Sequence, residues 1–421
     1  MHVLWLNAGL LLPLDKGGKL RTWHLMRHLA KRHQVTYLSF ADPSASPADV
    51  AGMSGVCDRL ETVPRREVRK GSPRFYLRAS RFLVDPAPYA VAAYRSREYR
   101  ARLNQLLEAH PFDALVCDFL VPAVNLPSRV PCPTVLFTHN VEAEIWRRHA
   151  ETERRGWRRA LLRSQWRRML RFEERTLSRF DVVLAVSDAD RETFGRLYGD
   201  RLRAPVRVIP TGVDARYFEA TVSIPFDPYR LAFTGSMDWL PNEDAVLYFC
   251  QDILPRIRRV EPRVTLSIVG RNPTPAVRRL ADALRGIEIT GRVDDIRPHV
   301  GRASLSIVPL RIGGGTRLKI YEAMAMGRPV VSTSVGAEGL PLVPGRDLAV
   351  ADDPGGFADA VLALLSDPAA RRRMADAARR LVTERYDWSA VAGTLEDAIR
   401  AAIPPRRTGA GVAQLLGEMR S

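Results

Sequence analysis

The stretch from residue 307 to residue 333 reads Ile307-Val-Pro-Leu-Arg-Ile-Gly-Gly-Gly-Thr-Arg-Leu-Lys-Ile-Tyr-Glu-Ala-Met-Ala-Met-Gly-Arg-Pro-Val-Val-Ser-Thr333. An apolar run ends in three glycines, a segment of helix-forming residues follows, and a second apolar run begins after Pro329. Thr316 suits the N-cap of a helix, and Gly327 with Pro329 is a typical stop signal. The pattern therefore predicts a strand, a glycine loop, a helix and a second strand.

The start of this predicted helix has the features of an anion site. The glycines at 313–315 lack a Cβ atom and let the backbone approach a ligand closely. A helix N-terminus attracts anions, and Arg317 and Lys319 add two cations there. Glu322, one turn later, can accept hydrogen bonds from hydroxyl groups. This combination suggests a phosphate joined to a polyol, as in a nucleotide sugar; the alternative is an ordinary glycine-rich turn with solvated basic residues.

Apolar runs alternate with helical segments along the whole chain, which is the signature of parallel sheets. Residues 216–229 contain two prolines and little periodicity, so we interpret them as a linker. We expect an α/β fold with two doubly wound Rossmann-like domains that face each other across a ligand cleft. The predicted domains are 1–215 and 216–387, followed by a helix over 388–403 that crosses back and a loosely ordered tail over 404–421. The predicted strands are 2–6, 35–40, 112–118, 134–137, 182–186, 206–209, 231–233, 264–269, 287–289, 305–308, 330–332 and 348–350.

Composition narrows the class of protein. The length of 421 residues favours two domains, and no apolar run reaches the roughly 18 residues that span a bilayer. The apolar residues 3–14 lack a basic lead and a cleavage site, so we expect no signal peptide. The four cysteines are scattered without a Cys-x-x-Cys pair, which argues against disulfides and a zinc site and suits the cytoplasm.

The net charge of +17 permits anionic partners without choosing among them. Its most unusual source is the segment from Trp146 to Arg179, in which three Trp-Arg-Arg triplets are interleaved with leucines. One interpretation is a helix packed on the sheet with a solvated basic face. A second is a peripheral helix on an anionic membrane surface, at the inner face of the cell membrane. Phosphate-rich acceptors or nucleic acid are a third, although we expect no nucleic acid.

Further motifs occur in a fixed order on both sides of the linker, and with them the chain resembles the group 1, or family 4, glycosyltransferases of the GT-B fold. The similarity runs from Gly17 to Trp388. It is closest in character to members that assemble exopolysaccharides and cell-surface sugars. The motifs that carry it, besides the stretch quoted first, are Thr138-His-Asn-Val-Glu142, Ala185-Val-Ser-Asp188, Val208-Ile-Pro-Thr-Gly-Val-Asp214, Phe233-Thr-Gly-Ser-Met-Asp-Trp-Leu-Pro-Asn242, Ile268-Val-Gly270 and Thr290-Gly-Arg-Val-Asp294.

The resemblance implies a retaining transfer of a sugar from a nucleotide-diphosphate sugar to a glycan or lipid-linked acceptor, without a metal or other cofactor. The C-terminal domain would bind the donor and the N-terminal domain the acceptor. Glu322 matches the glutamate that binds the donor ribose, and His139 matches a histidine near the transferred sugar. The catalytic residues expected are His139, Arg317 and Lys319; the donor-binding residues expected are Glu322, Gly313, Gly314, Gly315, Thr316, Gly235, Ser236, Gly17 and Gly18.

The chain departs from the family pattern at two places. Gly314 stands where the first glutamate of the Glu-x7-Glu motif is normally found. Ser236 and Asn242 stand where a basic pair often follows the first strand of the donor domain, so we expect Arg317 and Lys319 to neutralise the diphosphate instead.

Each expected role has a plainer alternative. Glu322 would otherwise be a surface helix residue, His139 a strand-end histidine bonded to backbone, and Gly17-Gly18 an ordinary turn. Two other functions also stay open. One is a nucleotide-sugar epimerase or hydrolase on the same fold, and the other is a non-catalytic sugar-binding assembly protein, which Gly314 makes plausible.

Overall fold

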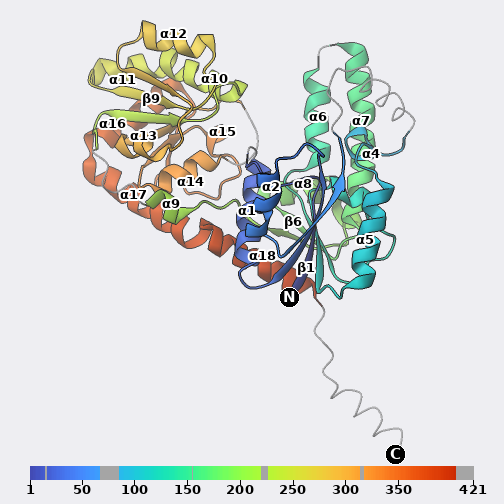
Figure 1. Ribbon diagram of the computed structural model, residues 1–421. Coiled ribbons are helices and arrows are strands. Elements are labelled where there is room, and N and C mark those ends of the chain that lie inside the picture. The colour runs from blue at the N-terminus through green and yellow to red at the C-terminus, as the bar shows by residue number, and fades with distance from the viewer. Residues whose placement is uncertain (15–16, 67–84, 154, 220–225, 313–316, 404–421) are drawn as a thin grey trace, which may run out of the picture. The chain divides into compact units, whose positions relative to one another are not determined.

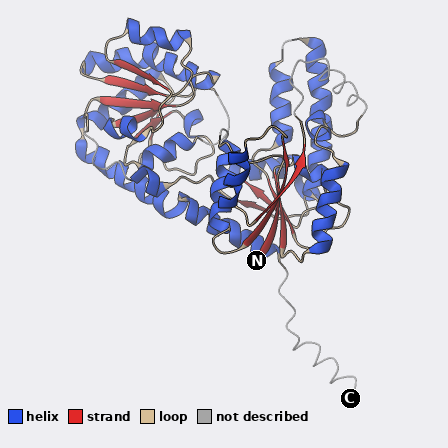
Figure 2. Ribbon diagram, in the orientation of Figure 1, coloured by secondary structure: helices blue, strands red, loops and turns tan. Residues whose placement is uncertain are grey.

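The computed structural model describes residues 1–14, 17–66, 85–153, 155–219, 226–312 and 317–403. The chain divides into two compact units. Unit 1 comprises Met1–Val186, Asp190–Ile209 and the chain from Ala392 onward, and unit 2 comprises Ser187–Ala189 and Pro210–Val391. Each unit contains one parallel sheet with helices on both faces, as predicted from the alternation of apolar runs and helical segments (Figures 1 and 2).

Unit 1 is built on a seven-stranded sheet of order β3-β2-β1-β4-β5-β6-β7, in which every pair is parallel. The strands in the middle of this sheet are mostly apolar because helices cover both faces. The strands are β1 (His2–Leu6), β2 (Gln34–Ala41), β3 (Arg59–Pro64), β4 (Ala114–Asp118), β5 (Thr134–Phe137), β6 (Val182–Ala185) and β7 (Val206–Val208). The helices are α1 (Gly17–Leu29), α2 (Pro47–Gly52), η1 (Met53–Gly55), α4 (Tyr89–Ala92), α5 (Arg97–Ala109), η2 (Val121–Asn125), α6 (Glu142–Thr152), α7 (Gly156–Leu177), α8 (Asp188–Tyr198) and η3 (Gly199–Arg201).

Unit 2 has a six-stranded parallel sheet of order β10-β9-β8-β11-β12-β13. Its strands are β8 (Arg230–Thr234), β9 (Thr265–Val269), β10 (Ile287–Gly291), β11 (Leu305–Val308), β12 (Val330–Ser332) and β13 (Ala349–Val350). The helices are α9 (Ala215–Glu219), α10 (Leu240–Tyr248), η4 (Phe249–Ile253), α11 (Leu254–Val260), α12 (Pro275–Ala283), α13 (Arg297–Arg302), α14 (Leu318–Ala325), α15 (Ser334–Ala337), α16 (Pro354–Ser366), α17 (Pro368–Leu381) and η5 (Val382–Tyr386). Helix α18 (Trp388–Ala402) begins in unit 2 and ends in unit 1.

Helices α6 and α7 pack along one another and extend past the sheet of unit 1 (Figure 1). The buried Glu173 of α7 accepts hydrogen bonds from the backbone N–H groups of Glu142 and Ala143, at 2.9 and 3.1 Å, and therefore caps the N-terminus of α6. The hydroxyl of Tyr198 donates to the same carboxylate. Burial raises the pKa of Glu173 to about 7.

The described part of the chain contains no helix that is both long enough and apolar enough to cross a membrane.

Candidate functional site

In unit 2, the strands β8 and β9 end in two glycines whose backbones touch. A Cβ atom on Gly270 would lie 1.7 Å from the carbonyl oxygen of Gly235. A Cβ atom on Gly235 would lie 2.5 Å from Nδ2 of Asn242 and 3.0 Å from Nζ of Lys319. These carboxyl ends of strands, where doubly wound sheets bind ligands, are therefore lined by bare backbone and by two polar side chains from α10 and α14.

Lys319 lies in the first turn of α14 and is half-buried. Its ammonium donates a 2.8 Å hydrogen bond to Oδ1 of Asn242 and lies 4.2 Å from the centre of the Phe233 ring. Among the described residues, no carboxylate oxygen lies within 4.0 Å of this nitrogen. Burial lowers the pKa of Lys319 to about 7, the nearby Glu322 opposes that shift, and Arg317 adds to it. A cation held away from water without a counter-ion is the arrangement expected where an anionic ligand binds.

Glu322 follows one turn later on the same face of α14 and is also half-buried. Burial raises the pKa of its carboxyl group to about 7, and the charge of Lys319 offsets part of that rise. Within the described parts of the chain, no side chain or backbone N–H donates to this carboxylate. It therefore keeps its acceptor capacity for hydroxyl groups of a ligand, and it is not the solvated surface residue of the plainer interpretation.

Arg317 differs from the expectation. It is the N-cap residue of α14 rather than part of its first turn, and only 4% of its surface is exposed. Burial lowers the pKa of its guanidinium, opposed by Glu338. Gly313, Gly314, Gly315 and Thr316 lie outside the described residues.

Ser236 has a partner that the sequence reasoning missed. Its Oγ accepts a 3.0 Å hydrogen bond from Nε of the exposed Arg271, which follows Gly270. The carbonyl of Ser236 accepts a 2.9 Å bond from Nδ2 of Asn242. Arg271 therefore adds a cation at the end of β9, next to the end of β8. The sequence could have predicted this contact, because adjacent parallel strands that both end in glycine bring the residues after those glycines together.

In unit 1, His139 lies just after β5 and is buried. Its Nε2 lies 2.7 Å from Oδ1 of Asp118, the last residue of β4. Its ring stacks on Phe119 at 3.8 Å between ring centres and an angle of 8°. The histidine is thus bonded to a carboxylate rather than to backbone, contrary to the plainer interpretation.

Gly17 and Gly18 are the first residues of α1 rather than a loop before it. A Cβ atom on Gly18 would lie 2.7 Å from Cζ of Phe119 and 3.7 Å from Nδ1 of His139. Phe119 has a φ of 68°, a conformation that costs a non-glycine residue about 1–3 kcal/mol. The small residue at 18 and the strained backbone at 119 together seat the Phe119 ring against His139.

Asp118 is the second residue that sequence reasoning missed. It is fully buried, and besides His139 it meets Trp5, Asn7 and Thr22, all within 3.2 Å. The sequence could have pointed to Asp118, because it is a lone carboxylate at the end of an otherwise apolar strand.

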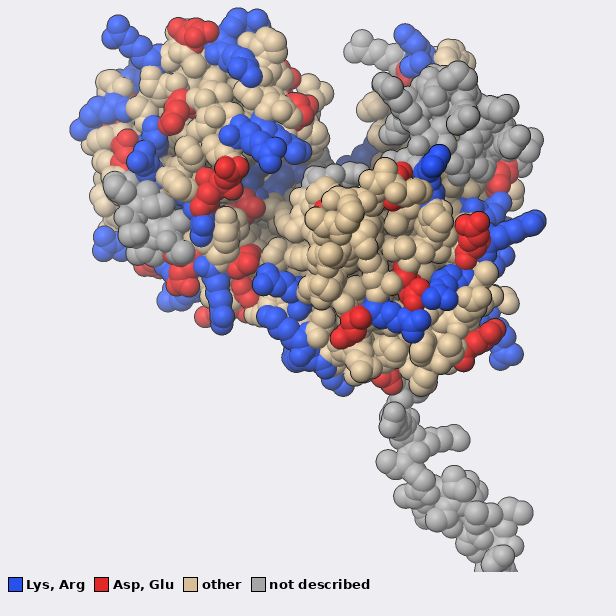
Figure 3. Space-filling view, viewed as in Figure 1, with Lys and Arg blue, Asp and Glu red and all other residues tan. Residues whose placement is uncertain are grey.

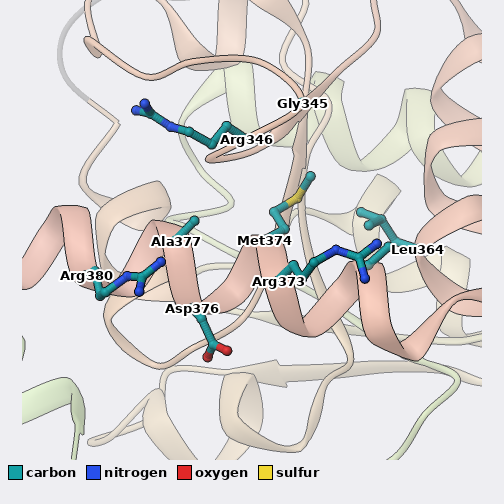
Figure 4. Close-up of a pocket in the computed structure, with 9 residues that line it drawn as sticks. Gly345, Arg346, Leu364, Arg373, Met374, Asp376, Ala377 and Arg380 are labelled. Atoms are coloured by element: carbon teal, nitrogen blue, oxygen red, sulfur yellow. The ribbon is translucent and has the colours of Figure 1, made fainter.

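Neither a metal-binding cluster of described residues nor the surface pocket described next adds a residue to this site. The described residues contain no group of three or more His, Cys, Asp or Glu side chains arranged to hold a metal ion. A surface pocket of about 500 Å³ lies on α16, α17 and the segment before β13, and its lining includes Met374, Asp376 and the arginines Arg346, Arg373 and Arg380 (Figure 4). None of the predicted site residues lines that pocket.

Families and proteins that are already known match most of both units of the chain. Residues 16–217 match the family "Glycosyltransferase Family 4", and residues 228–367 match "Glycosyl transferases group 1". The glycogen synthase of Mycobacterium tuberculosis is 29% identical over 293 residues, which is 67% of this chain and 66% of that protein, just under two thirds of its length. The phosphatidyl-myo-inositol mannosyltransferase of Mycobacterium leprae is 31% identical over 220 residues, 50% of this chain and 57% of that protein.

Among solved structures, the Anabaena protein Alr3699/HepE in complex with UDP is similar, with a TM-score of 0.65, 15% identity, and coverage of 95% of this chain and 100% of that one. WaaG, a glycosyltransferase involved in lipopolysaccharide biosynthesis, has a TM-score of 0.58 at 16% identity, over 94% of this chain and 99% of that one. At these identities the likeness establishes the fold, which is the GT-B fold of two α/β domains. With two family matches that together take in most of both units, the chain belongs to the group 1, or family 4, glycosyltransferases.

Proposed function

We propose that the protein transfers a sugar, with retention of configuration, from a nucleotide-diphosphate sugar to a glycan or lipid-linked acceptor in exopolysaccharide or cell-envelope assembly. The observation that carries the proposal is the Lys319 ammonium at the end of β8, bonded to Asn242 and without a carboxylate among the described residues. An activated diphosphate supplies the missing negative charge. Glu322, one turn away, then accepts hydrogen bonds from the ribose hydroxyls.

The main chemical requirement of sugar transfer is to stabilise the negative charge that develops on the leaving diphosphate. As the bond between the anomeric carbon and the phosphate oxygen breaks, negative charge grows on the diphosphate, and a preorganised cation stabilises it. In a front-face reaction the acceptor oxygen bonds to the same face of the anomeric carbon, and its proton passes to the departing phosphate. Lys319, Arg317 and the exposed Arg271 are the cations of unit 2 that we assign to this task; the chain needs no metal for it.

The names of similar proteins support a hexose donor. Structures of Alr3699/HepE hold UDP, UDP with glucose, and UDP-glucose. Curated relatives are named glycogen synthase, D-inositol 3-phosphate glycosyltransferase and phosphatidyl-myo-inositol mannosyltransferase. Their acceptors range from a glycan to a lipid, which is the range proposed for this chain.

A thermal-shift panel tests the proposal first, because a ligand that binds only the folded state raises the melting temperature. The panel contains UDP, GDP, ADP and dTDP sugars, with the matching nucleoside monophosphates as controls. We expect one diphosphate sugar to stabilise the protein more than its monophosphate. Product analysis then separates transfer from the two alternatives: an epimerised or hydrolysed donor without transfer indicates the first alternative, and binding without turnover indicates the sugar-binding assembly protein.

We further propose that the protein works peripherally at the cytoplasmic membrane face through the N-terminal end of α7. Trp157 is 66% exposed and Leu161 is 41% exposed, one turn apart on the same helix face. Arg155, Arg158 and Arg163 are exposed at the same end of the chain segment, and Arg158 lies over the Trp157 ring at 5.1 Å from its centre. An exposed indole and leucine with arginines nearby match an anionic lipid surface.

The rest of the segment packs onto the protein instead. Trp146 and Trp166 lie against the core of unit 1, and Arg168 donates to the carbonyl of Asp85. Arg147 and Arg148 pair with Glu144. The packed-helix interpretation therefore holds for these residues, and the membrane proposal is confined to the end of α7 around Trp157. Figure 3 shows acidic side chains interspersed with basic ones on the visible face, so the excess positive charge forms no continuous basic surface there.

Vesicle sedimentation tests this second proposal. Replacing Arg155, Arg158 and Arg163 with Gln should release the protein from vesicles that contain anionic lipid, and Trp157→Ser should act in the same direction. The double variant Arg147→Gln and Arg148→Gln is the matched control, because those charges are already paired with glutamate. Equal release by the control and the test variant, or no release by either, would overturn the proposal.

A further inference from the structure

The surface pocket of unit 2 combines an apolar floor with a basic rim (Figure 4). Its volume of about 500 Å³ lies within the roughly 300–1,000 Å³ of pockets that bind small molecules. Leu364 and Met374 line it from the edge of the unit 2 core and are 7% and 9% exposed. Ala370 and Ala377 complete the apolar part of the described lining. This lining contains no hydroxyl, amide or aromatic side chain that could recognise a sugar or a nucleobase.

Two arginines of the rim carry positive charge without a counter-ion. Arg373 and Arg380 are two helical turns apart on α17, and both are exposed. Among the described residues, no carboxylate oxygen lies within 4.0 Å of either guanidinium. Asp376 is the one acidic side chain of the described lining, and in Figure 4 it points away from the side of α17 that carries Met374 and Ala377. The pocket therefore has an excess of positive charge.

The third arginine of the rim is held by a turn that precedes β13. The buried Asp347 accepts hydrogen bonds from Nε and Nη2 of Arg346, at 2.8 and 2.9 Å, and from the backbone N–H of Val343 at 2.8 Å. Gly345, with a φ of 81°, donates its N–H to the carbonyl of Leu348 and closes the turn. The Nη1 group of Arg346 makes no hydrogen bond to a described residue, so it is preorganised to donate to a ligand.

The two parts of the pocket select a ligand with two parts. A guanidinium presents several N–H donors in a plane that matches the oxygens of a phosphate group. The flexible thioether of Met374 and the neighbouring Leu364 accommodate a hydrocarbon chain, whose burial is favourable. A ligand rich in hydroxyl groups would find few partners on this floor.

We propose that the pocket binds an alkyl phosphate, a phosphate monoester on a hydrocarbon chain. Arginines of the rim pair with the phosphate, and the chain lies over Leu364 and Met374. The proposal does not rest on the proposed glycosyl transfer, because none of the residues assigned to the donor site lines this pocket.

Titration calorimetry with three probes tests whether both parts of the pocket are used. Octyl phosphate carries the charge and the chain, inorganic phosphate carries only the charge, and octanol carries only the chain. We expect octyl phosphate to bind at least about tenfold more tightly than either of the others. Equal affinity for inorganic phosphate would identify an adventitious ion only, on a solvated basic helix. Equal affinity for octanol would show that the arginines play no part, and either result overturns the proposal.

Charge-matched variants assign the binding to this pocket. The double variant Arg373→Gln and Arg380→Gln should weaken octyl phosphate binding by about 5- to 30-fold. The control, Arg279→Gln with Arg372→Gln, removes the same total charge from exposed arginines that do not line the pocket. It should leave the affinity unchanged, and equal weakening by both double variants would contradict the assignment.

A variant that fills the pocket provides a test independent of charge. Ala377 is half-buried in α17 and lines the pocket, so the ring in Ala377→Phe occupies the space of the alkyl chain. We expect octyl phosphate binding to be lost while the melting temperature stays near that of the native protein. Undiminished binding by Ala377→Phe would overturn the proposal.

Vesicles that contain phosphatidic acid distinguish two sources of the ligand. If the phosphate belongs to a lipid in a bilayer, the double variant Arg373→Gln and Arg380→Gln should sediment less with these vesicles than the charge-matched control does. If the ligand is a free amphiphile, the two variants should sediment equally. Both results support the site when octyl phosphate binds as expected, and the proposal fails if octyl phosphate does not bind.

Discussion

The ammonium of Lys319 donates a 2.8 Å hydrogen bond to Oδ1 of Asn242, although the two residues are 77 positions apart in the chain. Asn242 stands near the position where the family often has a lysine. Lys319 thus brings a positive charge from α14 to the position of Asn242 on α10. We propose that this charge replaces the lysine that the family often has near residue 242.

Exchanging the two residues should preserve function. Lys319→Asn alone removes a charged hydrogen-bond donor, and we expect it to weaken binding of the diphosphate sugar by about 1.5–3 kcal/mol. Adding Asn242→Lys to that variant returns an ammonium to within a few ångströms of the original position and should recover most of the affinity. Titration calorimetry measures both steps. The explanation fails if the double variant binds no better than Lys319→Asn.

Donor affinity should fall as the pH rises through neutrality. Burial lowers the pKa of Lys319 to about 7, so the free protein loses the positive charge above that pH, and binding must then restore the proton. The diphosphate of a nucleotide sugar does not titrate in this range, so the slope reports on the protein. In the Glu322→Gln background, which removes the second group whose pKa lies near 7, we expect the dissociation constant to rise between about pH 6 and about pH 9, by at most tenfold per pH unit. Lys319→Met should flatten the plot of the dissociation constant against pH. If the slope of that plot is unchanged in the variant, Lys319 does not belong to the donor site.

Glu322→Ala should weaken nucleotide binding by about 1–3 kcal/mol, because charge-assisted hydrogen bonds to the ribose are lost. Glu322→Gln retains one acceptor oxygen and should lose less. The comparison that identifies the contact uses a 2′,3′-dideoxy nucleotide, which should bind less tightly than the ribonucleotide to the native protein but equally tightly to Glu322→Ala. Equal affinity of the native protein for both nucleotides would contradict the ribose role.

Gly270→Ala should destabilise unit 2 and weaken donor binding. The new methyl group would stand 1.7 Å from the carbonyl oxygen of Gly235, so β8 and β9 must separate at their ends. Gly195→Ala provides the contrast, since that glycine lies inside α8 with nothing within 4 Å of the added atom. It should stabilise the protein by about 0.5–1 kcal/mol. Differential scanning calorimetry measures the melting temperature of each variant, which should fall for Gly270→Ala and rise for Gly195→Ala. An unchanged melting temperature for Gly270→Ala would show that the ends of β8 and β9 can adapt to the added methyl group.

The strands that lie in the middle of each sheet were predictable from sequence. The predictions for residues 2–6, 134–137, 305–308 and 330–332 match β1, β5, β11 and β12 to the residue, because strands buried on both faces are continuous apolar runs bounded by polar residues. Strand β3 was missed. It lies at the edge of its sheet and reads Arg-Leu-Glu-Thr-Val-Pro, with Arg59 and Glu61 forming an ion pair on it. A charged edge strand has no hydrophobic pattern to detect.

One helical segment of unit 2 is less regular than its sequence suggests. The composition of residues 244–259 suits a single helix, but the structure divides this segment among α10, the π-helical turn η4 and α11. Pro255, in the first turn of α11, has no N–H to continue the hydrogen-bond ladder, and the extra residue of a π turn absorbs the break.

The site was only partly predictable for a different reason. Glu322 and Lys319 are three positions apart, so helical periodicity alone places them on one face. The partners of His139 and Ser236 come from neighbouring strands, and their identity depends on the order of strands in the sheet. Asp118 reaches His139 because β4 and β5 are adjacent, and Arg271 reaches Ser236 because β8 and β9 are adjacent. Strand order is a property of the whole chain that no local pattern contains.

The touching glycines at the ends of β8 and β9 also bear on how this enzyme can be re-engineered. Variant libraries built at Gly270 would mostly yield misfolded protein, since an added Cβ atom there overlaps the backbone carbonyl of Gly235, and a Cβ atom on Gly235 would displace the side chains of Asn242 and Lys319. Diversity aimed at donor preference belongs instead at Ser236 and Arg271, whose side chains border those strand ends. A screen restricted to these two codons leaves the contact between the two glycines unchanged.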